Sequence, residues 1–236
     1  MRHLSGSVAM SLKVAIMQPY FFPYNGYFRL FSAADMFVVL DCVQFPRRGY
    51  VHRNQLSDSQ DNPQWLTLPL LKADRDATRI CDLRFAPAPL NVMLDQFRRF
   101  PCLTKLTAIP GLSRSILDFE RTPVEYLVDN LRQVADLLEL RRPTILSSSL
   151  DISSEFKAQD RIIEIAKRVD ARHYINAPGG KGIYDPRAFA DAGLTLNFLS
   201  EYQGSFKSIL ERLLTEDAKT ITGELQRNTI LEHVSV

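Results

Sequence analysis

The chain has 236 residues, of which 45% are hydrophobic and 24% are charged, and its 29 Lys and Arg residues against 27 Asp and Glu residues give a formal net charge of +2. These values are ordinary for a globular protein and exclude a disordered, collagen-like or mucin-like chain. A charge this close to zero provides no broad cationic field for nucleic acid, so we expect no nucleic-acid partner.

The three cysteines and the absence of long apolar runs limit where the protein can reside. An odd number of cysteines without CxxC spacing indicates neither a disulfide framework nor a thiolate metal site and favours a reducing cytoplasm. No run of about 20 apolar residues exists, so we expect no transmembrane segment. Residues 1–12 have a basic start but lack the apolar core of a signal peptide, and we interpret them as an unstructured extension, of which residues 1–9 have no function.

Apolar periodicity predicts an α/β fold. The run 14–17 predicts a first strand, apolar positions 27, 30, 31 and 34 predict a helix, and the run 37–40 predicts a second strand, as at the start of a parallel βαβ unit. Further strands are predicted at 64–70, 80–85, 143–150, 173–176 and 194–199, and further helices at 90–106, 113–117, 124–140, 155–169, 186–192 and 205–214. We therefore predict a Rossmann-like, mostly parallel sheet with flanking helices, forming a single domain over 13–222 with a helical excursion at about 90–142.

The loop after the first predicted strand is the most informative stretch for function. It contains Gln18, Pro23, Gly26 and Tyr27 among several aromatic residues, and a helix follows it. Ligands of open parallel sheets bind beyond the carboxyl ends of the strands, where glycine lets the backbone approach an anion. Gln18 is thus a candidate catalytic residue and the other three are candidate binding residues; the alternative is that the aromatic rings are core and the prolines stiffen a turn.

A second polar stretch follows the next predicted strand. Asp41 ends that strand, and Gln44, Arg53 and Asn54 come after it, together with Arg47 and Arg48. A carboxylate at a strand end can hold a hydroxyl or an amine, and guanidinium groups bind phosphates or carboxylates in a bidentate manner. We expect Asp41 to be catalytic and Gln44, Arg53 and Asn54 to bind a phosphorylated or nucleotide-linked small molecule; a solvated loop with internal salt bridges is the alternative.

The glycine-rich segment 177–185 follows another predicted strand and precedes a helix. The amides of Gly179 and Gly180 can hold phosphate or carboxylate, with Lys181 as a point charge and Tyr184 or Asp185 placing a proton. The spacing matches neither a P-loop nor GxGxxG. The sequence also lacks HExxH and GxSxG, and His52 and His173 have no partner at metal-ligand spacing, so we predict no metal site. Cys42 is the thiol beside the candidate site.

These same residues resemble the WbqC-like family of bacterial proteins, which is found with genes for O-antigen and other surface polysaccharides. The resemblance covers about residues 13–200 and rests on KVAIMQPYFFPYNGYFRL, DCVQFPRRGYVHRNQL, QWLTLPLLKA and HYINAPGGKGIYDPRAFADAGLTLNFL. The chain departs from the family pattern at Cys42, where an acidic residue is typical, at His52, where asparagine is usual, and at Leu71, where a lysine is usual; Lys72 is retained.

The resemblance implies a setting in surface-polysaccharide biosynthesis more than a mechanism. Our leading hypothesis is a transferase that moves a small group onto a nucleotide-activated sugar or a glycan intermediate. Arg53, Lys72 and the amides of Gly179 and Gly180 would hold the anionic ligand, while Gln18 and Asp41 orient the reacting amine or hydroxyl. A nucleotidyltransferase-like or glycosyl-transferring enzyme and a non-catalytic nucleotide-sugar-binding protein are the alternatives. The histidines of the HxGH loop used by nucleotidyltransferases are missing here. The cofactor stays unassigned, and a homo-oligomer is one option for the assembly.

Overall fold

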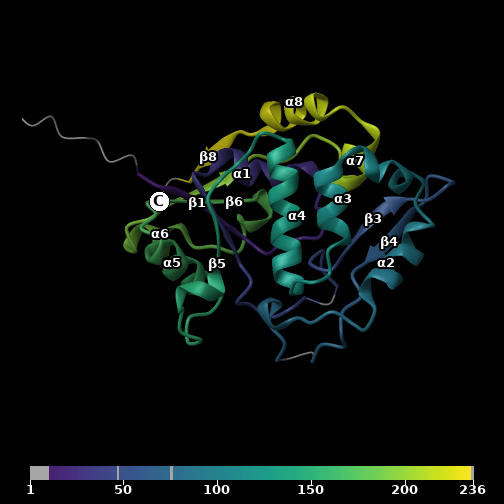
Figure 1. Cartoon of the computed structure of the whole chain (residues 1–236). Helices are drawn as coiled ribbons and strands as arrows, with labels where there is room; N and C mark the ends of the chain where they lie inside the picture. The colour runs from purple at the N-terminus through teal and green to yellow at the C-terminus, as the bar shows by residue number, and fades with distance from the viewer. Residues whose placement is uncertain (1–10, 47, 75–76, 235–236) are drawn as a thin grey trace, which may run out of the picture.

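The computed structural model describes residues 11–46, 48–74 and 77–234 and places a six-stranded sheet at the centre of the fold (Figure 1). Its strands run in the order β5 (Thr144–Leu146), β2 (Met36–Val39), β1 (Lys13–Met17), β6 (His173–Asn176), β7 (Thr195–Leu199) and β8 (Leu231–His233). The first five strands are parallel and β8 is antiparallel to β7. Taken in chain order, the strands are arranged 3-2-1-4-5-6, which is the order of a Rossmann fold. The predicted α/β fold with a mostly parallel sheet is confirmed.

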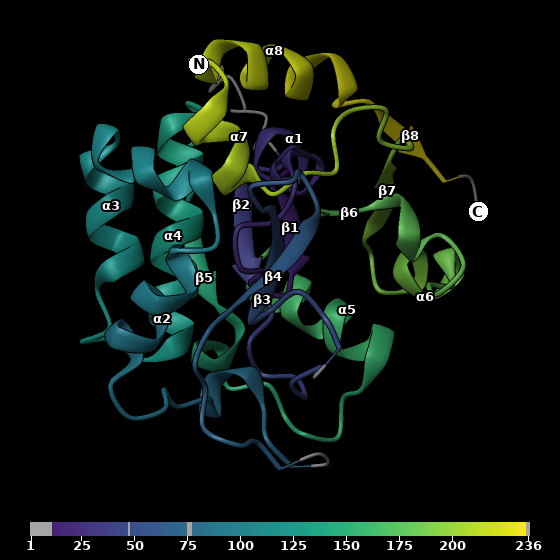
Figure 2. The same ribbon diagram turned by 90° about the vertical axis from the view of Figure 1, so that its right-hand side faces the viewer.

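Helices cover both faces of this sheet (Figure 2). On one face lie η1 (Asn25–Phe28) with α1 (Arg29–Ala33), α4 (Pro123–Leu137), α7 (Ile209–Thr215) and α8 (Ala218–Asn228); on the other lie α5 (Ala158–Arg168) and α6 (Pro186–Asp191). Successive side chains of β1 point to opposite faces of the sheet. Ala15 packs with the first group of helices, and Val14 and Ile16 pack with the second. Strands that are buried on both faces explain the uninterrupted apolar runs in the sequence.

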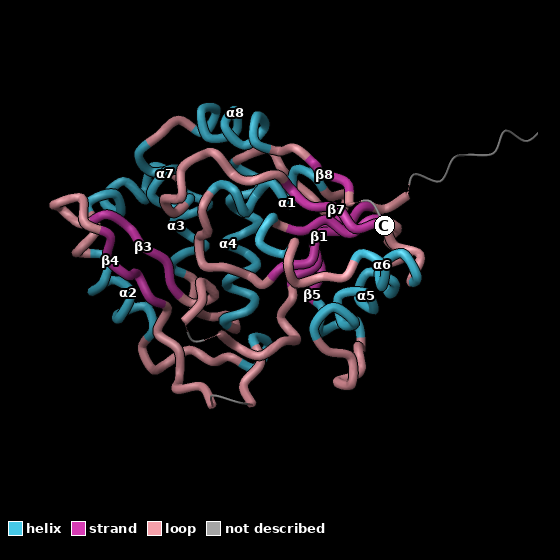
Figure 3. Tube along the Cα trace, turned by 180° about the vertical axis from the view of Figure 1, so that it is seen from behind, coloured by secondary structure: helices cyan, strands magenta, loops and turns pink. Residues whose placement is uncertain are grey.

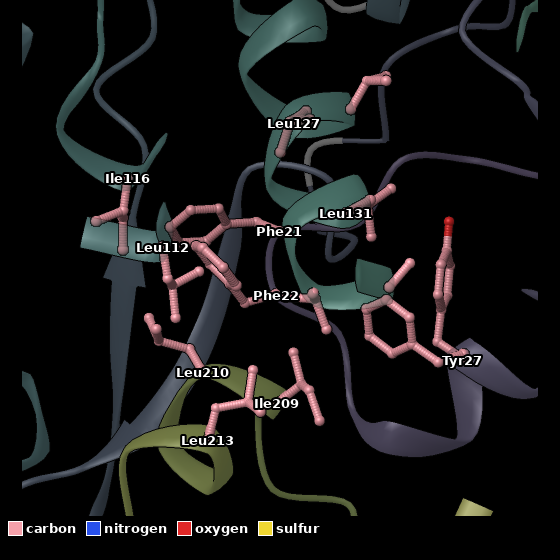
Figure 4. Packing of buried hydrophobic residues seen from close by; sticks show 14 of the residues in the cluster. Phe21, Phe22, Tyr27, Leu112, Ile116, Leu127, Leu131, Ile209, Leu210 and Leu213 are labelled. Atoms are coloured by element: carbon pink, nitrogen blue, oxygen red, sulfur yellow. The ribbon is translucent and has the colours of Figure 1, made fainter. Parts of the chain in front are cut away.

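The predicted helical excursion at 90–142 is present. It comprises α2 (Pro89–Phe97), η3 (Pro101–Ala108), α3 (Pro110–Leu117) and α4. Thr122 begins α4 with a capping box, since its side chain accepts from the Glu125 amide while the Glu125 carboxylate accepts from the Thr122 amide. The excursion shares the main core, where Phe21 and Phe22 of the aromatic loop lie among leucine and isoleucine side chains of α3, α4 and α7 (Figure 4).

A separate antiparallel hairpin, β3 (Arg53–Ser57) and β4 (Pro63–Thr67), lies apart from the sheet (Figure 3). It packs against α2, where the amide of Gln96 exchanges two hydrogen bonds with the backbone of Thr67, at 3.0 and 2.8 Å. This corrects the sequence prediction, in which 64–70 was a sheet strand and 53–54 was loop. Burial alternates along 53–57, where Asn54 and Leu56 are buried and their neighbours are partly exposed, as in a hairpin with one buried face.

Other boundaries differ from the predicted ones for local reasons. The segment 80–85 was predicted as a strand but contains the short 3-10 turn η2 (Ile80–Asp82). Helix α5 begins three residues later than predicted, after Lys157, because Asp151 is not a helix cap but ends η4 (Ser147–Leu150) in the left-handed region at φ 51°. The predicted strand 143–150 shortens to the three residues of β5 for the same reason.

The ends of the chain extend the sheet and the core. Residues 1–10 of the predicted extension 1–12 lie outside the described residues, while the Leu12 carbonyl accepts from the amides of Arg172 and His173. Leu225 is fully buried and β8 reaches His233, so the main core and sheet use residues beyond 222. None of the helices that the structure describes is long and apolar enough to cross a membrane.

Candidate functional site

A pocket of about 500 Å³ opens at the carboxyl edge of the parallel sheet. We call it the carboxyl-edge pocket. Its walls come from the end of β1, the segment after β2, the start of α5 and the loop before α6, and its lining residues are Gln18, Leu40, Cys42, Val43, Gln44, Lys157, Ala158, Gln159, Arg161, Ile162, Ile183 and Tyr184. In a sheet of this order the connections after β1 and β6 leave in opposite directions, and ligands bind in the crevice outside the carboxyl ends of those strands.

The first turn of α5 gives one wall of the pocket a positive character. Lys157 is the N-cap residue, and no side chain caps the helix, so the amides of Ala158 and Gln159 at its start lack a side-chain acceptor. The positive end of the helix dipole lies there as well. The Lys157 ammonium is exposed and forms no ion pair with any residue in the described part of the chain.

Arg161 adds a second cation one turn further along α5. Its Nη1 lies 3.3 Å from Sγ of Cys42, and its Nε donates to the Phe156 carbonyl at 2.8 Å. The guanidinium is therefore held in place at the pocket wall while part of its hydrogen-bonding capacity remains for a ligand. Cys42 is buried apart from its contribution to the pocket.

Gln18 lines the pocket directly after β1, and Tyr184 lines it from the loop between η5 and α6. The Tyr27 hydroxyl donates to the Gln18 carbonyl at 2.8 Å and fixes the backbone where β1 ends. Tyr184 is held edge-on against Tyr174 and Phe189 at ring distances of 5.9 and 5.6 Å. The Tyr184 ring is thus oriented before any ligand arrives, and the backbone at Gln18 is fixed.

Asp41 has a different position from the one its sequence context suggested. It is fully buried and does not line the pocket; its carboxylate accepts from Ser147 Oγ at 2.9 Å, from the Ser148 amide at 2.9 Å and from Ser148 Oγ at 2.6 Å. These bonds join the end of β2 to η4, and the amide of Cys42 also donates to Ser147 Oγ at 3.2 Å. In this structure Asp41 positions the strand end that carries Cys42.

Three predicted binding residues of the aromatic loop lie in the core. Pro23 is buried, with its carbonyl accepting from Ile209, and Tyr27 is buried with its hydroxyl on the Gln18 carbonyl. Burial raises the pKa of Tyr27 well above its usual range. Gly26 lies between the rings of Tyr24 and Tyr202, and a Cβ at this position would overlap the Tyr24 ring. None of the three lines the carboxyl-edge pocket.

Arg53 and Asn54 belong to the hairpin, away from the carboxyl-edge pocket. The Arg53 guanidinium lies over the Trp65 ring at 4.2 Å, with its buried Nε lacking a hydrogen-bond partner, and the Asn54 amide donates to the Phe22 carbonyl at 2.5 Å. Beside them, burial and the neighbouring Arg53 charge lower the pKa of His52 to about 4. Arg53 and Asn54 are therefore not brought together with Gln18 and Tyr184.

The remaining predicted residues are spread around the 177–185 segment and beyond. Lys181 pairs with Glu232 of β8, Asp185 caps α6 by accepting from the Arg187 amide at 3.0 Å, and Gly179 is exposed in η5 (Pro178–Gly180). Gly180 is buried, and a Cβ there would overlap Nδ2 of Asn176 and lie 3.1 Å from Tyr184. Gln44 lines the pocket. Lys72 and Arg48 are exposed outside it, and Arg47 lies outside the described residues.

Sequence reasoning missed Lys157, Gln159 and Arg161. Gln159 links two walls, because its Oε1 accepts from the Asp185 amide at 3.0 Å. The signal for these residues was topological: α5 connects β5 to β6, so its first turn must begin at the carboxyl edge of a parallel sheet. The late start of the helix concealed this signal, because a helix from 155 would have placed Gln159 and Arg161 in its second turn and Lys157 inside the helix instead of at its N-cap.

Comparisons with known proteins identify the family of the chain. The WbqC-like protein family profile matches residues 18–209, from the Gln18 of the pocket to the start of α7. The chain belongs to the WbqC-like family. A relative, the uncharacterized protein Rv1507c of Mycobacterium tuberculosis, is 25% identical to this WbqC-like chain over 197 residues, which cover 81% of the chain and 83% of the relative. No solved structure gives a significant match.

The pocket of this WbqC-like chain supports binding of an anion more directly than it supports metal chemistry. In the described part of the chain no group of three or more His, Cys, Asp or Glu side chains is arranged to hold a metal ion. The described lining contains two cations, three glutamine amides, one thiol and one phenol, and it contains no carboxylate or imidazole. Such a set can hold phosphate or carboxylate oxygens and can orient hydroxyl groups.

Proposed function

We propose that the carboxyl-edge pocket binds a phosphorylated or nucleotide-linked sugar and that the protein transfers a small group to it during assembly of a bacterial surface polysaccharide. The observation that carries this proposal is the placement of Lys157, Arg161 and the uncapped start of α5 on one wall of a pocket at the carboxyl edge of the sheet. The polysaccharide setting follows from the family resemblance.

The charge of the lining supports a phosphate group as the recognised feature. Two cations without a carboxylate among the described lining residues leave a net positive site, and helix amides add donors that point the same way. A phosphate there can accept from the backbone at Ala158 while it pairs with Lys157 and Arg161. A neutral ligand gains little from this wall.

The apolar part of the lining supports a larger group attached to the phosphate. Leu40, Val43, Ile162 and Ile183 are apolar, and Tyr184 presents a fixed ring. A volume of about 500 Å³ lies within the range of small-molecule and cofactor sites. A sugar or a base linked to phosphate uses both kinds of wall, which inorganic phosphate does not.

In a group transfer to this ligand, a hydroxyl or amine of the sugar attacks the donor and loses its proton as the new bond forms. The leaving group of the donor departs with the electrons of the broken bond. Gln18 can hold the attacking group through its amide oxygen, and the Tyr184 hydroxyl and the Cys42 thiol are the titratable groups with protons among the uncharged lining residues.

A second candidate, non-catalytic binding of the same ligand, is favoured by one observation. No carboxylate or imidazole belongs to the described lining, and these are the commonest general bases. In this case the protein would present a nucleotide-linked sugar to other components of an assembly complex.

The test is calorimetric titration of the protein with UDP, a UDP-sugar, a sugar 1-phosphate and inorganic phosphate. We expect the phosphorylated sugars to bind more tightly than inorganic phosphate. Lys157→Gln should weaken binding by about tenfold to a hundredfold, the effect of losing one charge-assisted hydrogen bond. Lys167→Gln is the matched control, since Lys167 is exposed in the last turn of the same helix and outside the pocket.

Arg161→Lys separates charge from geometry. The variant keeps one positive charge but loses the planar fork, so it should bind the phosphorylated sugar less tightly than the unchanged protein and more tightly than Arg161→Gln. Equal binding by Lys157→Gln and Lys167→Gln would contradict the proposed site. The protein and the sugar are also incubated with activated acyl donors, and the sugar is then analysed by mass spectrometry. Binding of the sugar without any modified product would favour the non-catalytic candidate.

A further inference from the structure

A second cavity of about 410 Å³ lies between the β3–β4 hairpin and the segment that leads into α7. We call it the hairpin pocket, and its lining includes Tyr50, Gln55, Ser57, Asp61, Phe206, Lys207 and Glu211. We propose that the hairpin pocket is a binding site for a neutral saccharide. This inference goes beyond the proposed function of the carboxyl-edge pocket and does not depend on it.

Two exposed aromatic rings form walls of the hairpin pocket, and each is held by further rings. Phe206 is 69% exposed, yet its ring stacks on Tyr24 at 5.0 Å and meets Tyr202 edge-on at 5.4 Å. Tyr50 is 48% exposed and lies 6.1 Å from Trp65. Exposed rings with a fixed orientation offer apolar contact area at low entropic cost, which is useful for a ligand and unnecessary for folding.

The polar part of the pocket is built from a buried carboxylate. Glu211 is 6% exposed, and its oxygens accept from the Ser57 amide at 2.8 Å, from Ser57 Oγ at 2.9 Å and from Lys207 Nζ at 2.9 Å. The side-chain amide of Gln55 forms no hydrogen bond with other described residues. The pocket therefore offers both acceptors and donors, and the carboxylate is held in a fixed position by its hydrogen bonds.

The charge of the hairpin pocket is opposite to that of the carboxyl-edge pocket. Asp61 and Glu211 outnumber Lys207 among the charged groups of its described lining. A phosphate or a sulfate is therefore repelled, whereas hydroxyl groups can donate to the carboxylate oxygens.

A saccharide fits this combination better than other neutral ligands. A pyranose ring has a face of C–H groups that packs on an aromatic ring and an edge of hydroxyls that both donate and accept. Phe206 and Tyr50 suit the face, and Glu211, Gln55 and Lys207 suit the edge. A purely apolar ligand would leave the buried carboxylate without new partners.

Segment 18–24 connects the two pockets. Gln18 lines the carboxyl-edge pocket, while Tyr24 supports the Phe206 ring, and between them the Phe21 amide donates to the Tyr50 carbonyl at 2.8 Å. A saccharide in the hairpin pocket therefore contacts rings that rest on the loop beginning at Gln18.

The experiment uses the single tryptophan as a reporter. Trp65 lies 6.1 Å from the ring of Tyr50, so a ligand on Tyr50 alters its emission. The full chain is titrated with glucose, galactose, mannose, N-acetylglucosamine and their methyl glycosides, with choline chloride and inorganic phosphate as charged probes, and binding is checked by saturation-transfer NMR of the sugar protons. We expect a saturable response to at least one neutral sugar and none to phosphate.

Phe206→Ala should weaken the sugar response by about fivefold to tenfold without lowering the melting temperature, because the ring is mostly exposed. Phe206→Tyr should retain the sugar response. The matched control is Ile230→Ala, which removes another exposed apolar side chain, 57% exposed and outside the pocket. Calorimetric binding of UDP-sugar to Phe206→Ala should match the unchanged protein, which separates this test from that of the carboxyl-edge pocket.

Three outcomes would overturn the proposal. They are the absence of a saturable response to every neutral sugar in both fluorescence and NMR, equal sugar affinity of Phe206→Ala and the unchanged protein, and a response to choline alone, which would indicate a site for an organic cation.

Discussion

Gly179 and Gly180 are neighbours in the chain but have opposite surroundings. A Cβ on Gly180 would overlap Nδ2 of Asn176 and lie 3.1 Å from the rings of Phe198 and Tyr184, whereas a Cβ on Gly179 would meet nothing within 4 Å. Gly180→Ala should therefore destabilise the protein by about 1–3 kcal/mol, the usual cost of overpacking, and should weaken ligand binding because Tyr184 must move. Urea unfolding and calorimetric titration measure the two effects.

Gly179→Ala is the matched control for that change. Neither glycine has a positive φ, so alanine is compatible with both backbones, and Gly179→Ala should be neutral or slightly stabilising. A similar loss of stability in both variants would show that the turn, and not the packing under Tyr184, requires glycine.

The same pair shows what sequence reasoning identifies at the scale of single residues. The sequence predicted that the Gly-Gly turn after a strand binds the ligand, and the structure places Gly180 beside Tyr184, which lines the pocket. The turn does not itself line the pocket, and Lys181 beside it pairs with Glu232. The partner of Lys181 comes from a strand 51 residues away in sequence, and no local pattern contains that information.

At the scale of elements, the carboxylate of Asp41 joins β2 to η4. It accepts three hydrogen bonds from Ser147 and Ser148 and is fully buried. Asp41→Asn replaces one acceptor oxygen by an NH2 group, which faces the Ser148 donors. We expect the free energy of unfolding to fall by about 1–3 kcal/mol. For a chain of this length, the melting temperature should fall by roughly 3–10 °C.

Asp191→Asn is the control for Asp41→Asn, since Asp191 is exposed at the end of α6. Unchanged stability of Asp41→Asn together with a complete loss of turnover would support the catalytic role that the sequence suggested. A parallel loss of stability and of ligand affinity would support the positioning role.

Elements that are buried on both faces were the predictable ones. The runs at β1, β2, β6 and β7 are apolar because helices cover both faces, and their strands were predicted within one or two residues. Strand β8 was not predicted, since it has three residues of which two are exposed, and its antiparallel pairing depends on the position of β7. The start of α5 was not predicted, because η4 and the loop after it occupy residues that were assigned to the helix and to the strand before it. The cationic wall of the pocket was missed with it.

At the scale of the whole molecule, Glu224 links the first helical turn to the last helix. Its carboxylate accepts from Asn25 Nδ2 at 3.1 Å, from Arg212 Nη1 at 2.7 Å and from the Tyr202 hydroxyl. Burial disfavours its charge, but these hydrogen bonds and the Arg212 charge outweigh burial and lower the pKa of Glu224 from 4.5 to about 2.

This shift predicts how stability depends on pH. A carboxyl group whose pKa is lower in the folded state stabilises the protein above its unfolded pKa, near 4.5, and loses that contribution as the pH falls toward 2. Glu224→Gln should therefore lower the free energy of unfolding by about 3 kcal/mol at pH 7 and by less than half of that at pH 3. Urea unfolding at both pH values measures the difference.

Glu155→Gln is the control, because Glu155 is exposed in the loop before α5. An effect of Glu224→Gln that is equal at pH 7 and pH 3 would mean that shape, and not charge, accounts for the contribution of Glu224. The sequence offered no indication of this network, since its members are distributed from residue 25 to residue 224.

The position of Arg29 has a consequence for how the protein is made. This fully buried guanidinium donates to the carbonyls of Ser200 and Asn228, which are synthesised 171 and 199 residues later. At a synthesis rate of about 5–20 residues per second, roughly 10 to 40 s separate Arg29 from its last acceptor. Until Asn228 is synthesised the buried guanidinium lacks one of its acceptors, so the packing around Arg29 is completed late in synthesis, as is usual for contacts that are distant in sequence.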